Sequence, residues 1–522
     1  MIYRLHLKDW LVIGHYLGAL ILIIAASMIA PFVVALLLGE LSAAVDFLYS
    51  IGIALIIGSL LLLCRVHKGP LDWHQALVIT GMCWIVLSFF GAVPLWLSGH
   101  YSSFLDAFFE TVSCFTTTGI SVTLDLDHMP LSVIMWRSVM NLLGGVGVVV
   151  VALALGIFGT GAAAATLYHD EARGDRVMPE IKQTARFILK VTGIVVASGT
   201  IACTIPCLLI GIEPTRAVLH GFFLTASDYT TGGMTAQSAG MMYYHCWPLE
   251  IITMVIMFFS GLNFLLYNDL WNGRLGSFFK DIEVRTIGIW ITILVVLIMF
   301  AMMAGSYYTD LGSMLRRGLY EIMSAALNIG YSTFYPGQML YGVGTGVLFV
   351  TILGMTIGAS ASSISGGIKA LRIGIIARSI TQTVRTALAP DKARPRTFFY
   401  HRGRQLLTPE LVSSAMTIML LYIATYAVGA VIGVMHGYDA LPSIFESVSA
   451  ASNTGLSSGI TQASMPNTLK ITYIIEMWLG RLEFIAIFAM FLQFFTALVT
   501  NFQSRKGRAG LLERIRRHRG QL

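Results

Sequence analysis

Long apolar stretches follow one another along almost the whole chain, and they restrict its possible folds more than any other feature. Each is close to the length of about 20 residues that an α-helix needs to cross a bilayer. Because lipid offers no partners for backbone hydrogen bonds, a stretch that crosses must be helical. The sequence predicts ten such spans: Trp10 to Leu38, Phe47 to Cys64, Ala76 to Ser98, Leu131 to Phe158, Phe187 to Ile212, Pro248 to Tyr267, Ile287 to Ala304, Gly344 to Ile376, Leu411 to Met435 and Ile471 to Thr500.

Composition agrees with a polytopic membrane protein. Hydrophobic residues make up 56% of the chain and charged residues 12%, so an estimate of soluble domains from length does not apply. The first span has no small-residue cleavage site followed by a soluble region, and we interpret it as a retained helix and not as a signal peptide.

One short pattern occurs four times between these spans. The copies are SCFTTTGIS from Ser113, SDYTTGGMT from Ser227, SAALNIGYS from Ser324 and SAASNTGLS from Ser449. They align on four glycines: Gly119, Gly233, Gly330 and Gly455. A single glycine of this kind is typical of a turn, but four in one register between apolar spans need another explanation.

Each motif follows an apolar segment that is too short to cross the bilayer, such as residues 104–115 or 441–451. A half-crossing helix with a polar return is tolerated at membrane depth only where protein or water surrounds it. We therefore expect an all-α membrane protein with four repeats of helix, re-entrant pore loop and helix in a pseudo-fourfold arrangement. The expected units are a transmembrane helix pair in 1–70, pore repeats in 71–180, 181–280, 281–404 and 405–504, and a basic cytoplasmic tail in 505–522.

Three copies of the motif carry a glutamate nine residues before the glycine, namely Glu110, Glu321 and Glu446, whereas the second copy has Leu224. We expect these carboxylates near the outer ends of the short helices, where they would cap the helix and complement its dipole. Direct coordination of an ion is the alternative.

Basic residues predict the orientation, because cytoplasmic connections carry more lysine and arginine. With the amino terminus inside, the inner segments include Lys369 to Arg404 and the tail from Arg505 to Arg519, and the four motifs face outside. The net charge of +7 could also indicate nucleic-acid binding, but no recognised binding module is present. We therefore expect a lipid bilayer and no nucleic acid as partner.

Four such loops around one axis would favour a cation. Each short helix would point its carboxyl terminus, with its partial negative charge, toward the bilayer midplane. The glycine would let backbone carbonyl groups line a narrow axis. Rings of carbonyl oxygens replace the hydration shell of a monovalent cation.

These motifs resemble the filter of the TrkH, KtrB and HKT superfamily of potassium transporters, in which each of four linked repeats supplies one glycine. Further matches are NLLGGVG from Asn141, GMTIGASASSISGGIK from Gly354 and GRLE from Gly480, and the extra amino-terminal helix pair is similar to the TrkH branch. The third loop departs from the family, which often has threonine before the glycine, and Gly232 precedes the second filter glycine. Glycine at all four positions implies potassium.

The resemblance implies the site residues. The potassium-binding filter would comprise Thr117, Thr118, Gly119, Thr231, Gly232, Gly233, Asn328, Ile329, Gly330, Asn453, Thr454 and Gly455. The potassium ion would contact Thr118, Gly119, Gly232, Gly233, Ile329, Gly330, Thr454 and Gly455. The gate would comprise Gly354, Gly358, Ser360, Ser362, Ser363, Gly366, Gly367, Lys369 and Arg481.

Two features carry the gate hypothesis. Glycine and serine interrupt the eighth span, and we interpret it as a broken helix, although close packing of small residues is the alternative. Arg481 would cost about 2.5–3.5 kcal/mol at the bilayer centre, so it should face protein or water. The resemblance places it beside the loop as a positive barrier, and the alternative is an ion pair with Glu483 or Glu476.

The sequence thus predicts potassium uptake across the bacterial inner membrane, with both termini cytoplasmic. A sodium-permeable or cation-coupled symporter of the same fold is the alternative, and an unrelated secondary transporter is a further one. No HExxH, GxxxxGK[ST] or GxSxG motif is present, so we expect neither an enzyme nor a covalent cofactor, and K⁺ is the transported ion. The resemblance implies a homodimer regulated by a TrkA-like cytosolic ring of nucleotide-binding subunits.

Overall fold

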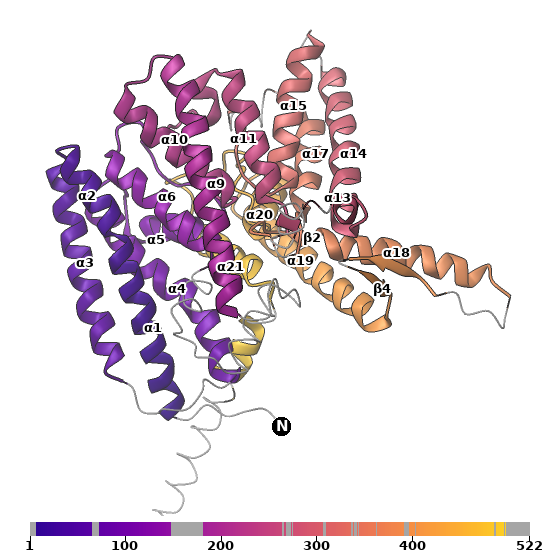
Figure 1. Cartoon of the computed structure of the whole chain (residues 1–522), viewed down its shortest axis with the longest axis horizontal. Helices are drawn as coiled ribbons and strands as arrows, with labels where there is room; N and C mark the ends of the chain where they lie inside the picture. Colours follow the sequence, from indigo (N-terminus) through magenta and orange to yellow (C-terminus); the bar gives the residue numbers. More distant parts are fainter. Residues whose placement is uncertain are drawn as a thin grey trace, which may run out of the picture.

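The computed structural model of the chain is built almost entirely of helices (Figure 1). It describes residues 7–64, 73–147, 181–263, 266–267, 273, 275–305, 310–335, 338, 342, 344–361, 363–390, 396–401, 403–484, 487–494 and 496. The expected tail in 505–522 lies outside the described residues.

Six segments of the described chain are long and apolar enough to cross a membrane: Asp9–Leu37, Leu41–Leu62, Leu77–Leu97, Arg186–Leu209, Ile282–Gly305 and Pro409–Met435. They agree with the first, second, third, fifth, seventh and ninth expected spans. The helices that carry them are α1 (Leu7–Ser27) with α2 (Ile29–Leu37), α3 (Leu41–Leu62), α4 (Trp73–Leu97), α9 (Ile181–Leu209), α14 (Ile282–Gly305) and α19 (Pro409–Met435). The chain is therefore a multi-pass membrane protein, and a total of ten crossing helices remains a prediction.

Four shorter helices coincide with the predicted half-crossing segments: α5 (Phe104–Phe115), α10 (Pro214–Tyr229), α15 (Leu311–Ala326) and α20 (Ala440–Ala451). With 12 to 16 residues at 1.5 Å each, they are about 18 to 24 Å long and cannot cross a hydrocarbon core of about 30 Å. Side chains cap two of them, because Ser103 accepts from the Asp106 amide and Asp310 accepts from the Ser313 amide. The latter bond lowers the pKa of exposed Asp310 below its ordinary value.

The helix that follows each of these four is also short: α6 (Leu131–Gly145), α11 (Trp247–Ser260), α17 (Gly344–Thr356) and α21 (Asn467–Arg481). Helices α6, α11 and α21 therefore end before the fourth, sixth and tenth expected spans do. A left-handed residue cannot continue a right-handed helix, and such residues follow α6 at Gly147 and α21 at Glu483 and Phe484. Residues 148–158 of the fourth span lie outside the described part.

The eighth span is broken as predicted. After α17 come strand β1 (Ile357–Gly358), an irregular segment, strand β2 (Ile368–Lys369) and helix α18 (Ala370–Ala387), with β1 and β2 paired in parallel. A hairpin of β3 (Phe398–Tyr400) and β4 (Arg404–Leu406) then leads to α19. The remaining elements are the 3₁₀-helix η1 (Gly240–Tyr244) and the single turn α13 (Leu275–Phe278).

The helices pack around several apolar cores. Helices α1 to α3 lie at one edge, and α18 with its neighbouring hairpin projects from the opposite edge (Figure 1). One apolar core joins α1, α3, α4 and α6 around buried Trp84 and Trp136. Another joins α14, α15, α17, α19 and α20 around buried Tyr422 and Phe445.

Candidate functional site

The four half-crossing helices end in one common backbone conformation. The second residue before each aligned glycine is left-handed: Thr117 (φ 53°), Thr231 (53°), Asn328 (55°) and Asn453 (52°). The next amide then donates to the carbonyl group of the motif serine: Thr118 to Ser113 (2.8 Å), Gly232 to Ser227 (2.7 Å), Ile329 to Ser324 (2.8 Å) and Thr454 to Ser449 (2.9 Å). The backbone of each loop therefore leaves its helix in the same way.

The loops meet at their aligned glycines and close into a ring. A Cβ atom on each glycine would collide with a backbone carbonyl oxygen of the next loop, at 2.4 Å from Gly119 to Gly232, 2.4 Å from Gly233 to Ile329, 2.3 Å from Gly330 to Thr454 and 2.1 Å from Gly455 to Thr118. All four glycines also have positive φ, between 59° and 98°. Only glycine fits such a position without strain.

Two asparagines fasten neighbouring loops to each other. The Asn328 side-chain amide donates to Thr454 Oγ1 at 2.7 Å, and that of Asn453 donates to Thr118 Oγ1 at 2.9 Å. Both asparagines are fully buried. The third loop's departure from threonine thus places a side chain that links loops three and four.

An open cavity of ≈ 310 Å³ lies on one side of the ring. All four aligned glycines line it, together with the residue two positions after each: Ser121, Thr235, Ser332 and Ser457. The cavity is therefore lined by hydroxyl groups and touches every one of the four loops.

The motif glutamates do not cap the helix starts, and that expectation is wrong. Each lies inside its helix and holds the returning chain. One matched pair of bonds reaches each glutamate, from the side chain 11 residues later and the amide 12 residues later: Ser121 and Val122 to Glu110, Ser332 and Thr333 to Glu321, and Ser457 and Ser458 to Glu446. A carboxylate has two acceptor oxygens and can accept several such bonds at once.

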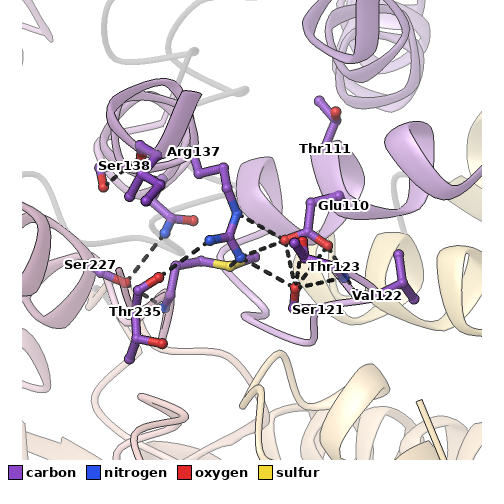
Figure 2. A network of polar contacts seen from close by, with 12 residues as sticks. Glu110, Thr111, Ser121, Val122, Thr123, Arg137, Ser138, Ser227 and Thr235 are labelled. Atoms are coloured by element: carbon purple, nitrogen blue, oxygen red, sulfur yellow. Dashed lines mark hydrogen bonds and ion pairs between the residues drawn. The ribbon is translucent and has the colours of Figure 1, made fainter. Parts of the chain in front are cut away.

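Arg137 of α6 is a functional residue that the sequence interpretation missed (Figure 2). Its guanidinium group pairs with Glu110 at 2.6 Å and donates to the Thr235 carbonyl oxygen at 3.3 Å, so it links the first and second loops. Both side chains of the pair are buried, at 2% and 0% exposed. A charged residue inside an expected span was the available signal.

The second loop, which has Leu224 in place of glutamate, is held by other groups. Ser227 Oγ accepts from the Met234 amide at 2.6 Å and from the Asn141 side chain at 3.3 Å. The neighbouring Asp228 carboxyl group is fully buried and has no hydrogen-bond partner among the described residues. The sequence interpretation did not single out Asp228.

The irregular segment between β1 and β2 packs against the loops on the side away from the cavity. A Cβ atom on Gly366 would lie 2.1 Å from the Ser452 carbonyl oxygen, and Ser365 Oγ donates to Asn328 Oδ1 at 3.0 Å. Gly358 packs against Gly366, and Gly367 has φ 65°. This segment therefore lies directly beneath loops three and four.

The predicted gate residues other than Arg481 divide into three groups. Gly358, Ser360, Ser363, Gly366 and Gly367 lie in or beside the segment, where Ser363 donates to the Ser360 carbonyl oxygen at 2.7 Å, and Lys369 donates to the Ser365 carbonyl oxygen. Gly354 instead lies within α17, before the break in the eighth span, and packs against Ala325 of α15. Ser362 lies outside the described residues.

The segment is also tied to the helices beside it. The Ser360 amide donates to the Gly261 carbonyl oxygen at 3.2 Å, and the Ala361 amide donates to Glu283 at 2.6 Å. Glu283 lies at the start of α14, and the preceding Asp281 carboxyl group lies 3.1 Å from Nδ1 of His401 in the hairpin region. A chain of polar contacts thus connects the hairpin with the segment.

Arg481, at the end of α21, contacts the segment and the first loop together. Its guanidinium group donates to the Ile364 carbonyl oxygen at 2.8 Å, to Thr117 Oγ1 at 3.1 Å and to the Gly144 carbonyl oxygen at 2.8 Å. Glu483 and Glu476 were the alternative ion-pair partners of Arg481. Glu483 pairs with Arg372, and Glu476 accepts a hydrogen bond from Ser447. The prediction that Arg481 lies beside the segment is confirmed.

Known proteins resemble the whole chain. The TrkH family model, described as a cation transport protein, matches residues 45–495. A protein of Methanocaldococcus jannaschii named an uncharacterised cation transporter is 28% identical, over 94% of this chain and 96% of its own length. The Trk system potassium uptake protein TrkH of Salmonella typhimurium is 27% identical, over 92% of this chain and 98% of its own.

A solved structure shares the fold. The crystal structure of the potassium transporter TrkH from Vibrio parahaemolyticus matches with a TM-score of 0.77 at 23% sequence identity. The match covers 92% of this chain and 98% of that chain.

Proposed function

Because the chain belongs to the TrkH family of cation transport proteins, we propose that it takes up potassium through the ring of four loops. Members of this family are ion transporters and not enzymes. The curated relative of Salmonella typhimurium carries the name of a potassium uptake protein. In this proposal the ring is the ion-selectivity filter, and the four repeats surround it in a pseudo-fourfold arrangement.

One observation carries the proposal. The carbonyl groups of Thr118, Gly232, Ile329 and Thr454 each contact the glycine of a neighbouring loop around a closed ring. Carbonyl oxygens that converge in this way can replace the water shell of a dehydrated monovalent cation. The helices that precede them point their negative ends toward the ring, which favours a cation there.

The segment between β1 and β2 acts as the gate. It lies on the side of the ring opposite the cavity, so an ion that has passed the filter meets it next. Arg481 places a positive charge at the same level, and a fixed charge repels a cation strongly where water screens it weakly. The bonds from Arg481 to Ile364 and Thr117 hold the segment against the filter.

The remaining parts of the proposal follow from the family resemblance and from charge. The protein acts as a homodimer in the bacterial inner membrane, with both termini cytoplasmic. A TrkA-like ring of nucleotide-binding subunits regulates it from the cytosol. Projecting helix α18 and its hairpin lie on the basic, inner side, where such a partner would bind.

Growth of a bacterial strain that lacks its own potassium uptake systems tests the proposed substrate. Expression of this chain should restore growth at low potassium, and purified protein in liposomes should take up rubidium in preference to sodium. Equal uptake of both ions would favour the sodium-permeable alternative. If the folded protein neither restores growth nor takes up rubidium, the proposed function is contradicted.

A further inference from the structure

Glu476 is a buried carboxyl group that the filter and gate do not use. It lies in α21, is 3% exposed, and sits between α19 and α20. Its Oε1 atom lies 2.8 Å from Ser447 Oγ, and its Oε2 atom has no hydrogen-bond partner among the described residues. No ion pair found in the described part of the chain includes Glu476.

If Glu476 were ionised, two acceptor oxygens would compete for the single hydrogen of the Ser447 hydroxyl group. Ser447 Oγ lies within bonding distance of two oxygens, Glu476 Oε1 and the Tyr426 carbonyl oxygen at 3.1 Å. A hydroxyl group carries a single hydrogen and can donate fully to only one of them. If Glu476 is protonated, its O–H donates to Ser447 Oγ and the serine donates to Tyr426, so that all three oxygens are satisfied.

The chain is shaped to hold the carboxyl group in this place. A Cβ atom at Gly429 of α19 would lie 1.9 Å from Glu476 Oε1 and 2.5 Å from Ser447 Oγ. Glycine therefore leaves the space that the acid and the serine occupy.

Among the residues that the structure describes, no cation forms an ion pair with the Glu476 carboxyl group. The other ionisable side chains on the elements that pack here are Glu410, Tyr422 and Tyr426 on α19, Glu446 on α20, Lys470, Tyr473 and Arg481 on α21, and Asp106, Glu110 and Cys114 on α5. Lys470 pairs with Asp106 at 2.5 Å, and Arg481 donates to backbone oxygens at the gate. A buried carboxylate without a partner is so costly that such a group takes up a proton instead.

We propose that Glu476 is a proton-binding site, in which the protonated carboxyl group ties α21 to α20 through Ser447. Helix α20 carries Ser449, whose Oγ accepts from the Gly455 amide at 3.1 Å. Loss of the proton would leave two acceptors competing for the Ser447 hydrogen and would loosen this contact. The link from the proton to the fourth loop of the filter rests on the proposed function.

Infrared spectroscopy of the full-length protein in liposomes tests the proton site. Glu476→Gln should remove a carbonyl band of a protonated carboxylic acid at neutral pH, and Ser447→Ala should shift that band because the acid loses its acceptor. The control, Glu410→Gln, changes an exposed residue at the start of α19 and should remove a carboxylate band only. Loss of a carboxylate band in Glu476→Gln, or a parent spectrum with no acid band sensitive to Ser447→Ala, would overturn the proposal.

Rubidium uptake across a pH series tests the link to the filter. Uptake by the parent should fall as pH rises, whereas uptake by Glu476→Gln, which cannot ionise, should hold at high pH. Asp228→Asn provides the comparison, because Asp228 is another buried carboxyl group, and neither of its oxygens has a hydrogen-bond partner among the described residues. If the parent and Glu476→Gln lose uptake equally, the link is wrong. A parent that takes up no rubidium would contradict the proposed function and leave the infrared result standing.

Discussion

Each glycine of the ring is required for two separate reasons. Its φ is positive, and its missing side chain leaves room for a carbonyl group of the next loop. A left-handed backbone costs other residues about 1–2 kcal/mol, and a Cβ atom 2.1 Å from a backbone oxygen cannot be accommodated without movement of that backbone. The sequence predicted these glycines because four copies shared one register.

Substitution of one glycine should alter ion selectivity. Gly119→Ser or Gly455→Ser should push the adjacent carbonyl group out of the ring and reduce discrimination between rubidium and sodium. The measurement is uptake of each ion by reconstituted protein. Gly52→Ser is the control, because a Cβ atom at Gly52 meets nothing within 4 Å. Unchanged selectivity in both variants would place the filter elsewhere.

The pair of Glu110 and Arg137 should behave as one unit. Arg137→Met leaves a buried carboxylate without its partner and should destabilise the protein by about 3–5 kcal/mol. Adding Glu110→Gln should recover part of that loss, because the stranded charge is removed. Thermal unfolding in detergent measures both effects. A double variant that is less stable than Arg137→Met would show that Glu110 does not need this partner.

At the scale of elements, the helices after the loops all end early, and the sequence interpretation found only one of the four breaks. Glycines near the ends of α6 and α21 pack closely against the half-crossing helices. A Cβ atom on Gly144 would lie 2.0 Å from the Phe115 carbonyl oxygen, and one on Gly480 would lie 1.9 Å from the Ala451 carbonyl oxygen. These glycines let each helix touch the end of a half-crossing helix. Apolar composition continues past the breaks, so hydropathy alone could not reveal them.

Shortening the segment between Gly358 and Ser365 should raise rubidium uptake. Arg481→Ala should also raise it, but by less, because a steric block remains. The effect of Arg481→Ala should shrink at high salt, since salt screens charge and not bulk. Uptake by liposomes with matched protein content measures both, and the size-exclusion profile verifies folding. If both variants fold and neither exceeds the parent rate, the gate lies elsewhere.

The contact between Glu283 and the segment offers a milder test of the same element. Glu283→Ala removes the acceptor of the Ala361 amide, so the segment should move more freely and uptake should rise. The rise should be smaller than that from shortening the segment, because Ser365 and Ser360 keep their bonds. Glu213→Ala, at an exposed residue before α10, is the control. Uptake equal to that of the control would exclude a holding role for Glu283.

For the whole molecule, the sequence predicted the membrane class and the half-crossing helices, while the polar links between repeats escaped it. Apolar length and glycine register are local signals that survive without structure. The pairing of Arg137 with Thr235, or of Asn453 with Thr118, joins residues far apart along the chain. Such contacts depend on how the repeats are arranged, which no single segment specifies.

The orientation in the membrane can be tested with single cysteines. In a variant without the native cysteines, Ser238→Cys, at an exposed residue near the cavity, should react with a membrane-impermeant thiol reagent from outside the cell. Gln405→Cys, in the exposed strand β4, should react only after the membrane is opened. The reverse labelling pattern would contradict the predicted orientation.

The most direct test of the central claim is the position of bound rubidium, whose anomalous scattering identifies the ion in crystals of this protein. We predict a rubidium peak inside the ring, coordinated by the carbonyl oxygens of Thr118, Gly232, Ile329 and Thr454, and its loss in Gly119→Ser crystals. Protein that takes up rubidium yet shows no peak in the ring, or shows it bound away from all four loops, would contradict the account.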